Sequence, residues 1–311
     1  MTLAHRLEAT LVRAALALVR ALPVTAASDL GGAVARTLGP LLPVSRVAET
    51  NLRHALPALD AAARRRVIRL MWDNLGRTVA EFPHLAALRE CPAGPGWEIV
   101  GADELRALAA RGGPAIFFSG HIGNWELLPP AAAAYGVPFA SVYRAAKNPL
   151  IDAMIAELRA GAAGLAMPRY PKGAAGARQT LAHLAAGGRV AMLMDQKMND
   201  GIPVPFFGRT AMTAPALAAL ALRFRCPVIP AHVERLGPAR LRIIVEAPLD
   251  LPETGDRAAD IARLTRAVNA TLERWIRDRP EGWLWLHHRW PRSHESGYDP
   301  GPAPGAETGR A

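Results

Sequence analysis

The sequence predicts an α/β protein in which helices cover both faces of a central sheet. Half of its 311 residues are apolar, so the chain can bury one large core or two smaller ones. From residue 101 onward, short apolar runs alternate with longer helical segments. The runs are 115–118, 139–143, 190–194, 228–233 and 241–245, and the helical segments are 152–160, 174–186 and 213–224. Each helical segment is long enough to return the chain across a sheet, so the alternation favours strands joined by helical crossovers.

Helices are expected to dominate the first hundred residues. Ser45 is positioned to cap a helix that reaches residue 54, and Asp60 to cap a longer one with apolar residues at helical spacing toward Phe82. Pro83 is expected to end that second helix, because a proline removes a backbone donor and clashes with the preceding turn.

The N-terminal segment at 7–24 is apolar, but cations interrupt it. Arg6, Arg13 and Arg20 repeat every seven residues and therefore lie along one side of a helix. The longest uncharged stretch, 14–19, is far short of the ~20 residues needed to cross a bilayer. We expect neither a spanning helix nor a cleaved export signal. Two interpretations stay open: a helix that lies in the membrane interface, or a helix packed on the protein's own core.

The chain is expected to have three parts. Residues 1–40 form N-terminal helices that associate with a membrane under the first of those interpretations. Residues 41–292 hold the α/β domain, including a last helix predicted at 255–277. Residues 293–311 are rich in Pro, Gly and Ser and are predicted to be disordered.

The net charge of +10, from 34 Arg and three Lys against 27 acidic residues, predicts an anionic partner. Nucleic acid, an anionic membrane surface, a phosphorylated lipid and an acidic protein all fit. The sequence has no basic stretch interleaved with stacking aromatics, which disfavours nucleic acid. Its two cysteines, Cys91 and Cys226, provide neither a disulfide framework nor the spacing of a zinc site.

One segment combines an apolar strand with groups suited to proton transfer. The strand that ends near Phe118 runs into Gly120, and His121 follows beyond its carboxyl end, where α/β sheets place their ligands. Asn124 is positioned to cap a following helix, which puts Glu126 in the first turn, within reach of the His121 ring. A carboxylate on one ring nitrogen leaves the other nitrogen to remove a proton from a hydroxyl. The same spacing also fits a histidine that only bonds a loop and a glutamate that only stabilises the helix dipole.

These residues also carry a resemblance to a known family. Gly120-His121-Ile122-Gly123-Asn124-Trp125-Glu126 resembles the H-x4-D/E block of the lysophospholipid acyltransferase superfamily, specifically of its bacterial lipid A late acyltransferase branch, the lauroyl/myristoyl transferases. Further blocks follow in that branch's order: Val142-Tyr143-Arg144 with Lys147-Asn148-Pro149-Leu150, Asp195-Gln196-Lys197, Val204-Pro205-Phe206-Phe207-Gly208 with Thr213, and a closing block at 283–290. The sequence departs from the pattern at Pro129 and Pro130 and at His288, where a second Arg is common.

The resemblance implies a mixed sheet of the glycerol-phosphate-acyltransferase type, sandwiched by helices. It implies transfer of a fatty acyl chain from acyl carrier protein to a hydroxyl of a lipid A precursor, on the cytoplasmic face of the cell inner membrane. The acyl thioester is then the co-substrate, and neither a soluble cofactor nor a metal is implied. His121 would deprotonate the acceptor hydroxyl, and Glu126 would orient and stabilise the charged imidazole. The basic charge would serve the acidic acyl carrier protein or the anionic inner leaflet.

The same resemblance implies substrate-binding roles in the other blocks. Arg144 and Lys147 lie beyond a predicted strand, where cations suit phosphates or an oxyanion. Asp195 and Gln196 are expected either to bind sugar hydroxyls of the acceptor or to anchor the next loop. The stretch 206–208 is expected to form a wall of the pocket or of an acyl-chain channel. The predicted substrate-binding residues are Asn124, Arg144, Lys147, Asn148, Asp195, Gln196 and Gly208.

Alternatives from other classes remain. A nucleic-acid-binding protein fits the charge, and a membrane-bound scaffold that lost its activity fits the fold, although the presence of both His121 and Glu126 disfavours it. Within the acyltransferases, the acceptor is either a lipid A precursor or another lipid, such as a lysophospholipid, an aminolipid or a glycosylated phosphoinositide.

Overall fold

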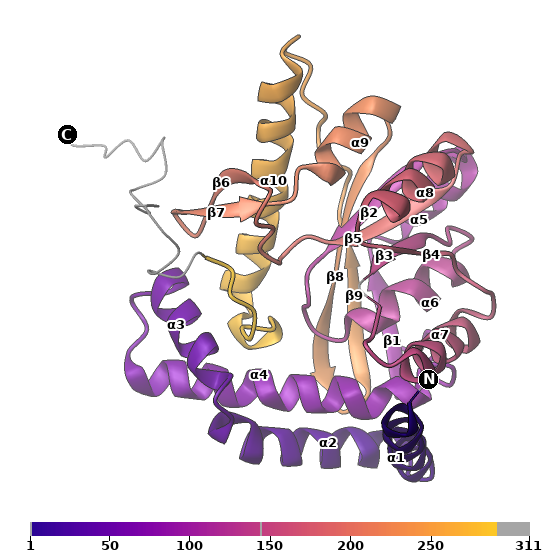
Figure 1. The fold of residues 1–311 in the computed structure, drawn as a ribbon, viewed down its shortest axis with the longest axis vertical. Helices are drawn as coiled ribbons and strands as arrows, with labels where there is room; N and C mark the ends of the chain where they lie inside the picture. The colour runs from indigo at the N-terminus through magenta and orange to yellow at the C-terminus, as the bar shows by residue number, and fades with distance from the viewer. Residues whose placement is uncertain (1, 144, 291–311) are drawn as a thin grey trace.

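The computed structural model describes residues 2–143 and 145–290, and a seven-stranded sheet lies at its centre (Figure 1). The strand order is β1-β9-β8-β2-β5-β3-β4, and a separate hairpin pairs β6 with β7. The strands are β1 (Gly96–Val100), β2 (Ala115–Ser119), β3 (Ala140–Tyr143), β4 (Arg169–Pro171), β5 (Arg189–Leu193), β6 (Ile202–Phe206), β7 (Arg209–Thr213), β8 (Val228–Gly237) and β9 (Arg240–Val245).

The central sheet is mixed but mostly parallel. All neighbouring pairs are parallel except β8 with β9, which form an antiparallel hairpin. Strands β2, β3, β4, β5 and β8 therefore run in one direction, and their carboxyl ends share one edge of the sheet. The five strands predicted from apolar runs are confirmed, whereas β1, β4 and the β6–β7 hairpin had no apolar run that predicted them.

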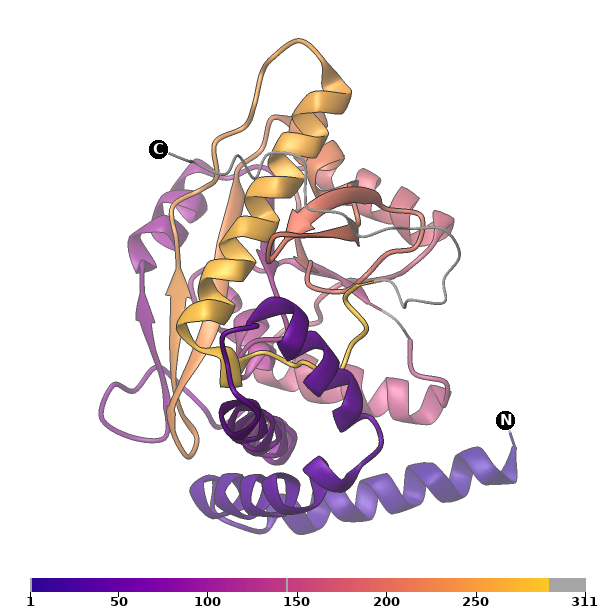
Figure 2. The same cartoon turned by 90° about the vertical axis from the view of Figure 1, so that its left-hand side faces the viewer.

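Helices cover both faces of the sheet, which confirms the predicted α/β class. Helices α8, α9 and α10 pack on one face, and α5, α6 and α7 belong to the other (Figures 1 and 2). Helices α2 and α4 run side by side across the carboxyl end of β8. The helices are α1 (Leu3–Arg20), α2 (Val24–Leu38), α3 (Ser45–Ala55), α4 (Ala61–Glu81), α5 (Ala102–Arg111), α6 (Leu128–Ala134), α7 (Pro149–Ala163), α8 (Ala174–Ala185), α9 (Ala216–Phe224) and α10 (Arg257–Asp278).

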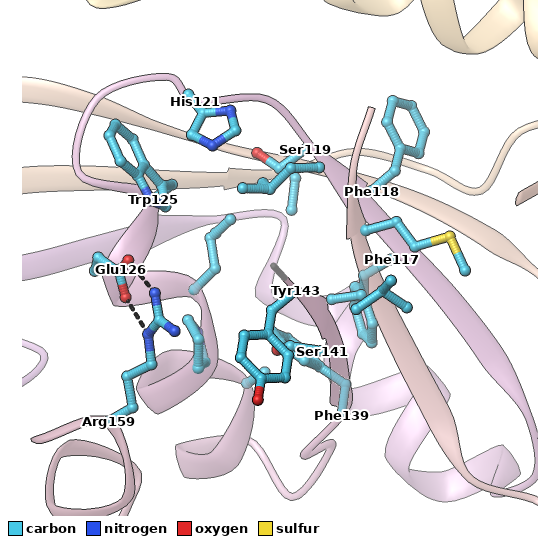
Figure 3. Close-up of a pocket in the computed structure, with 18 of the residues that line it drawn as sticks. Phe117, Phe118, Ser119, His121, Trp125, Glu126, Phe139, Ser141, Tyr143 and Arg159 are labelled. Carbon is cyan, nitrogen blue, oxygen red and sulfur yellow. Dashed lines mark hydrogen bonds and ion pairs between the residues drawn. The ribbon is translucent and has the colours of Figure 1, made fainter. Parts of the chain in front are cut away.

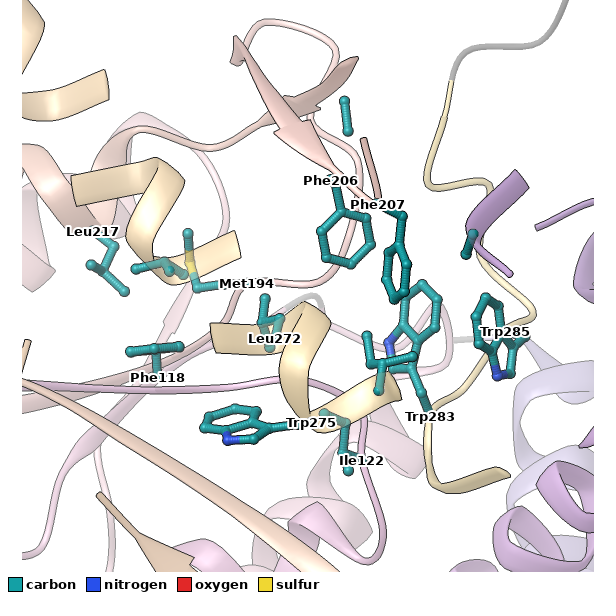
Figure 4. Packing of buried hydrophobic residues seen from close by; sticks show 14 of the residues in the cluster. Phe118, Ile122, Met194, Phe206, Phe207, Leu217, Leu272, Trp275, Trp283 and Trp285 are labelled. Atoms are coloured by element: carbon teal, nitrogen blue, oxygen red, sulfur yellow. The ribbon is translucent and has the colours of Figure 1, made fainter. Parts of the chain in front are cut away.

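The alternation of side chains along β2 divides the core in two. Phe117 faces α5 and α6 and packs on Phe139, with ring centroids 5.4 Å apart. Phe118 faces the opposite layer and stacks on Trp275 of α10 at 5.8 Å (Figure 4). Because successive residues of a strand point to opposite faces, one apolar strand anchors both helical layers.

The helix boundaries follow the predicted caps in one case and not in the other. The Asp60 carboxylate accepts a hydrogen bond from the Ala63 N–H at 2.7 Å and caps α4, which ends at Glu81, just before Pro83. The Ser45 cap is wrong: Ser45 is the first residue of α3, and its hydroxyl donates to the Gly39 carbonyl. This bond ties the start of α3 to the preceding turn.

The N-terminal helices pack on the rest of the protein along one side only. Helix α2 lies against α4, where Gly31 and Gly76 approach so closely that a Cβ on either would clash with the other's carbonyl. Helix α1 contacts α7, and Ala9 is the one buried residue of this helix. Among the helices that the structure describes, none is long and apolar enough to cross a membrane. The predicted disordered tail at 293–311 lies outside the described residues.

Candidate active site

His121 lies in the loop that follows β2, at the carboxyl edge of the parallel strands. This loop is fixed at Gly123, whose φ of +60° is in the region that favours glycine. The Gly123 N–H donates to the Gly282 carbonyl at 2.9 Å, and its own carbonyl accepts from Asn74 and Thr78 of α4. A Cβ at this position would lie 2.0 Å from the Val233 carbonyl oxygen, so the loop sits directly against β8.

The carboxylate that contacts His121 belongs to Asp195. The His121 Nδ1 lies 2.9 Å from Asp195 Oδ1, and the His121 backbone N–H donates to Oδ2 at 2.8 Å. Asp195 follows β5, the neighbour of β2, and is fully buried. The Trp283 indole also donates to Oδ2, at 2.8 Å. An ionised carboxylate only accepts hydrogen bonds, so Nδ1 carries the proton and Nε2 is left as the basic nitrogen.

This arrangement makes the His121 imidazole more basic than usual. Burial alone would lower the pKa of His121, but the charge of Asp195 and its hydrogen bond outweigh burial and raise that pKa. The Glu126 carboxylate adds to the increase, and the Lys172 ammonium opposes it. In the same way, although burial favours the neutral acid, the imidazole and the donated hydrogen bonds hold the pKa of Asp195 well below its usual range.

The predicted contact between Glu126 and the His121 ring is wrong. The Glu126 carboxylate instead binds the Arg159 guanidinium of α7 through two bonds, Nε to Oε2 at 2.7 Å and Nη2 to Oε1 at 2.6 Å (Figure 3). The reason is local: the chain after Asn124 forms a single 3₁₀ turn, and α6 starts only at Leu128. Pro129 therefore occupies the first turn of a new helix, where proline is tolerated, rather than the interior of a longer one.

A cavity of about 430 Å³ opens beside His121. Its polar part includes Glu126, Arg159, Lys172 and Gln196. Its apolar part lies between the sheet and α6 and reaches α5; Figure 3 shows Phe117 and Phe139 on the side away from His121. The apolar residues that line it include Leu105, Phe117, Ala131, Phe139, Ile243 and Val245. The cavity thus joins a basic histidine to a space that suits an alkyl chain.

Aromatic side chains frame the His121 ring. Trp125 meets it edge to face at 5.0 Å, and His287 lies at 5.1 Å. His287 belongs to the closing block, whose Leu284 N–H donates to the His121 carbonyl at 3.0 Å. The Gln196 amide nitrogen lies 3.3 Å from the His287 ring. The closing block therefore bonds to the His121 backbone and packs beside the His121 ring.

Asn124 supports the site by holding the His121 loop against α4 rather than by binding substrate. It is fully buried, makes no capping hydrogen bond, and donates through Nδ2 to Glu81 Oε2 at 2.8 Å. Glu81 also accepts from Ser28 of α2 and pairs with Arg235 of β8. Both predictions for Asn124, helix cap and substrate contact, are therefore corrected: the residue fixes the loop to α4.

Other predicted substrate-binding residues have structural partners. Asn148 is buried; its oxygen caps α7 by accepting from the Leu150 N–H, and its amide donates to the His5 carbonyl and to Glu8 of α1. Asp195 is closed off from solvent and bonds His121 and Trp283, a role that differs from both the predicted sugar contact and the predicted anchor for the next loop. Lys147 is exposed, Gln196 lines the cavity, and Arg144 lies outside the described residues.

The predicted aromatic wall is also wrong. Phe206 and Phe207 are buried among Trp283, Trp285 and Trp290 in the α10 layer (Figure 4), and Gly208 forms the exposed turn between β6 and β7. Within the described part of the chain, none of the residues 206–208 lines the cavity beside His121.

The contributors to the site that the sequence analysis missed include Arg159, Lys172 and Trp283. Arg159 lies in the middle of α7 and Trp283 in the closing block, both more than 30 residues from His121. No local pattern marks Arg159. Asp195 and Trp283 had a weak signal, because each belongs to a block of the resemblance. The contact of Asp195 with His121 depends on strand order, and Trp283 reaches the site through its bond to Asp195.

A buried Asp–His pair that opens onto an apolar cavity is typical of enzymes that deprotonate a hydroxyl beside a hydrophobic substrate. The family described as "Bacterial lipid A biosynthesis acyltransferase" matches residues 3–292. A protein of Haemophilus influenzae (strain ATCC 51907 / DSM 11121 / KW20 / Rd) named "Lipid A biosynthesis acyltransferase" is 22% identical over 244 residues, which cover 77% of this chain and 73% of that protein. The chain therefore belongs to the lipid A biosynthesis acyltransferase family and is an acyltransferase.

Proposed function

We propose that the protein transfers a fatty acyl chain from acyl carrier protein to a hydroxyl of a lipid A precursor, at the cytoplasmic face of the cell inner membrane. The observation that carries this proposal is the His121–Asp195 pair beside the apolar cavity. The family membership supports the lipid A precursor as acceptor, and the acyl thioester is the co-substrate. We infer no need for a soluble cofactor, because a thioester is already an activated acyl donor.

In the proposed reaction, His121 Nε2 takes the proton of the acceptor hydroxyl as its oxygen attacks the thioester carbonyl carbon. Asp195 holds Nδ1–H and stabilises the imidazolium that forms. The C–S bond then breaks, and the departing thiolate recovers the proton from Nε2. The apolar part of the cavity holds the acyl chain, which fixes the carbonyl near His121.

Glu126 acts indirectly in this scheme. Its two bonds to Arg159 hold that guanidinium at the polar part of the cavity, and its charge adds to the basicity of His121. The pair also joins the His121 loop to α7, the helix against which α1 packs. Glu126 is therefore a positioning residue rather than the partner of the imidazole.

The N-terminal helices present an apolar surface that suits a membrane interface. Eleven of the seventeen exposed large apolar residues in the described chain lie within the first 44 residues. On α1, Leu3, Leu7, Leu11 and Leu18 share one face, and they are 62–83% exposed. Arg6, Arg13 and Arg20 flank this face, as in helices that lie in an anionic interface. Because α1 packs on α7, whose Asp152, Ile155 and Arg159 line the cavity, we expect the site to lie beside the lipid layer when this surface is bound to a membrane.

Membrane binding is expected to depend on this face. Replacing Leu7 and Leu11 by serine should lower partition onto vesicles of phosphatidylethanolamine and phosphatidylglycerol by about tenfold or more, since each buried leucine contributes roughly 1.5–3 kcal/mol. The matched control replaces Val100 and Leu165, which are exposed elsewhere, and should bind as the wild type does. Equal partition of the two variants in a flotation assay would refute the assignment.

The acceptor is tested by mass spectrometry of the lipid product. The full chain is incubated with a mixture of acyl carrier protein thioesters and, in separate reactions, with a lipid A precursor or a lysophospholipid. We expect the mass of one acyl chain to be added to the lipid A precursor. Acylation of the lysophospholipid alone would keep the enzyme class and overturn the acceptor.

A further inference from the structure

Strand β2 carries a hydroxyl between the apolar part of the cavity and His121. Phe117 and Ser119 point to the same face of the sheet, because successive side chains of a strand alternate between faces. Both residues line the cavity, as does His121, which follows two positions later, and Figure 3 shows Ser119 between the other two. Since a strand advances about 3.3 Å per residue, Ser119 lies roughly 7 Å closer than Phe117 to the carboxyl edge of the sheet.

The carbonyl group of an acyl thioester has to occupy the same level of the cavity. Its alkyl chain fills the apolar part beside Phe117, and its carbonyl carbon is attacked by an oxygen whose proton goes to His121. The carbonyl joins the chain to the point of attack, so it lies between these two residues along β2. On the neighbouring strand β5, the residue paired with Ser119 is Leu193, whose side chain has no hydrogen-bond donor. The Ser119 hydroxyl is therefore the donor that β2 and β5 provide at the level of the carbonyl.

This hydroxyl is buried at the site but only weakly engaged. Ser119 is 3% exposed, so little water competes for it. Its hydroxyl donates to the Gly120 carbonyl at 3.3 Å, which is longer than the range of about 2.5–3.0 Å usual for hydroxyl donors. The same carbonyl accepts a hydrogen bond from the Ile122 N–H at 2.8 Å. Rotation about one side-chain bond can therefore direct the hydroxyl to a stronger acceptor and leave the Gly120 carbonyl with a partner.

We propose that Ser119 is a catalytic residue whose hydroxyl donates a hydrogen bond to the oxyanion formed during acyl transfer. The proposal rests on the proposed function, because it needs an acyl thioester carbonyl beside His121. As the acceptor oxygen bonds to the carbonyl carbon, the π electrons of the C=O bond move to the carbonyl oxygen, and the acceptor's proton moves to His121 Nε2. The Ser119 O–H stabilises that negative oxygen and keeps its own proton. When the C=O bond forms again, the C–S bond breaks and the thiolate takes the proton from Nε2.

The hydrogen bonds of the site favour this role over that of a serine nucleophile. A nucleophilic serine gives its proton to the neighbouring base and is hydrogen bonded to it. In the described part of the chain, the Ser119 hydroxyl bonds the Gly120 carbonyl instead, and the His121 ring bonds Asp195. The basic Nε2 of His121 is thus left for the acceptor hydroxyl, and the acyl chain passes directly from sulfur to the acceptor oxygen.

Kinetics of Ser119→Ala test the proposal, with the lipid that takes the acyl chain in the mass-spectrometric assay as acceptor. We expect kcat to fall about 10²- to 10³-fold, the usual loss when one oxyanion donor is removed. KM for either substrate should stay within about threefold of the wild type, because the hydroxyl engages the oxygen only as charge develops on it. The matched control is Thr180→Val, which removes another buried hydroxyl that bonds a backbone carbonyl, outside the cavity, and should keep kcat within about threefold.

The pH profile and the mass of the protein separate this role from its alternatives. The acid limb of kcat reports the titration of His121, so in Ser119→Ala it should stay at the wild-type pH while the plateau falls. An acid limb that moved with the rate would mean that Ser119 acts only through His121. Wild-type protein incubated with the acyl thioester and no acceptor should keep its mass, whereas a gain of one acyl chain on Ser119 would make it a nucleophile. Either result, or a kcat equal to that of the control, would overturn the proposal; acylation of another lipid in place of the lipid A precursor would overturn only the acceptor.

Discussion

Replacing His121 by alanine is expected to lower kcat by about 10²- to 10⁴-fold, the usual contribution of a positioned general base. The chain should remain folded, because Asp195 keeps two other donors, the backbone N–H of residue 121 and the Trp283 indole, each at 2.8 Å. Turnover is measured with both substrates saturating, and folding by circular dichroism.

A second histidine provides the control for this result. His183 lies on α8, bonds the Arg189 carbonyl at 3.1 Å, and is not among the residues that line the cavity. His183→Ala should leave kcat within about threefold of the wild type. If His121→Ala also retained near wild-type turnover, the role of His121 as base would be refuted.

Replacing Glu81 by alanine is expected to cause the largest loss of stability. Glu81 is fully buried and accepts from the Ser28 hydroxyl, the Asn124 amide and the Ala239 N–H, besides its pair with Arg235. Removing one partner of a buried ion pair costs about 3–5 kcal/mol, since the other charge stays buried without compensation. The free energy of unfolding, from urea titration, should fall by that amount.

Glu157→Ala is the matched control, since Glu157 is exposed on α7, and its unfolding free energy should stay within about 0.5 kcal/mol of the wild type. A Glu81→Ala protein as stable as this control would contradict the structural role of the Glu81–Arg235 pair. Because Asn124 connects Glu81 to the His121 loop, the variant should also lose turnover at temperatures where it is still folded.

The order of elements could be predicted from the sequence, but the pairing of the strands could not. Period and length mark the apolar strands, and the glycine after β2 marks the turn that presents His121. The contact between His121 and Asp195 joins residues 74 positions apart and exists because β5 lies next to β2. That adjacency is a property of the whole sheet, so no local spacing reveals it.

The local backbone geometry explains why Glu126 contacts Arg159 and not the predicted His121. An α-helix that started at Asn124 would have turned the carboxylate back toward the ring. The 3₁₀ turn and the restart of the helix at Leu128 direct it to Arg159 instead. Asn148 and the 206–208 stretch show a related error: a motif residue is as easily a buried anchor for the site as a contact for substrate.

The pH dependence of kcat for the wild type and for Asp195→Asn tests the His121–Asp195 pair most directly. His121 acts as a base only when neutral, and the Asp195 charge raises its pKa, so the wild-type rate should fall on acidification through a pKa above the usual ~6.5. In Asp195→Asn the charge is gone and burial remains, so the acid limb should move to lower pH and the plateau should fall at least about tenfold, because a less basic imidazole is a weaker proton acceptor. An acid limb at the same pH in both proteins, with unchanged turnover, would contradict the pair as the catalytic base.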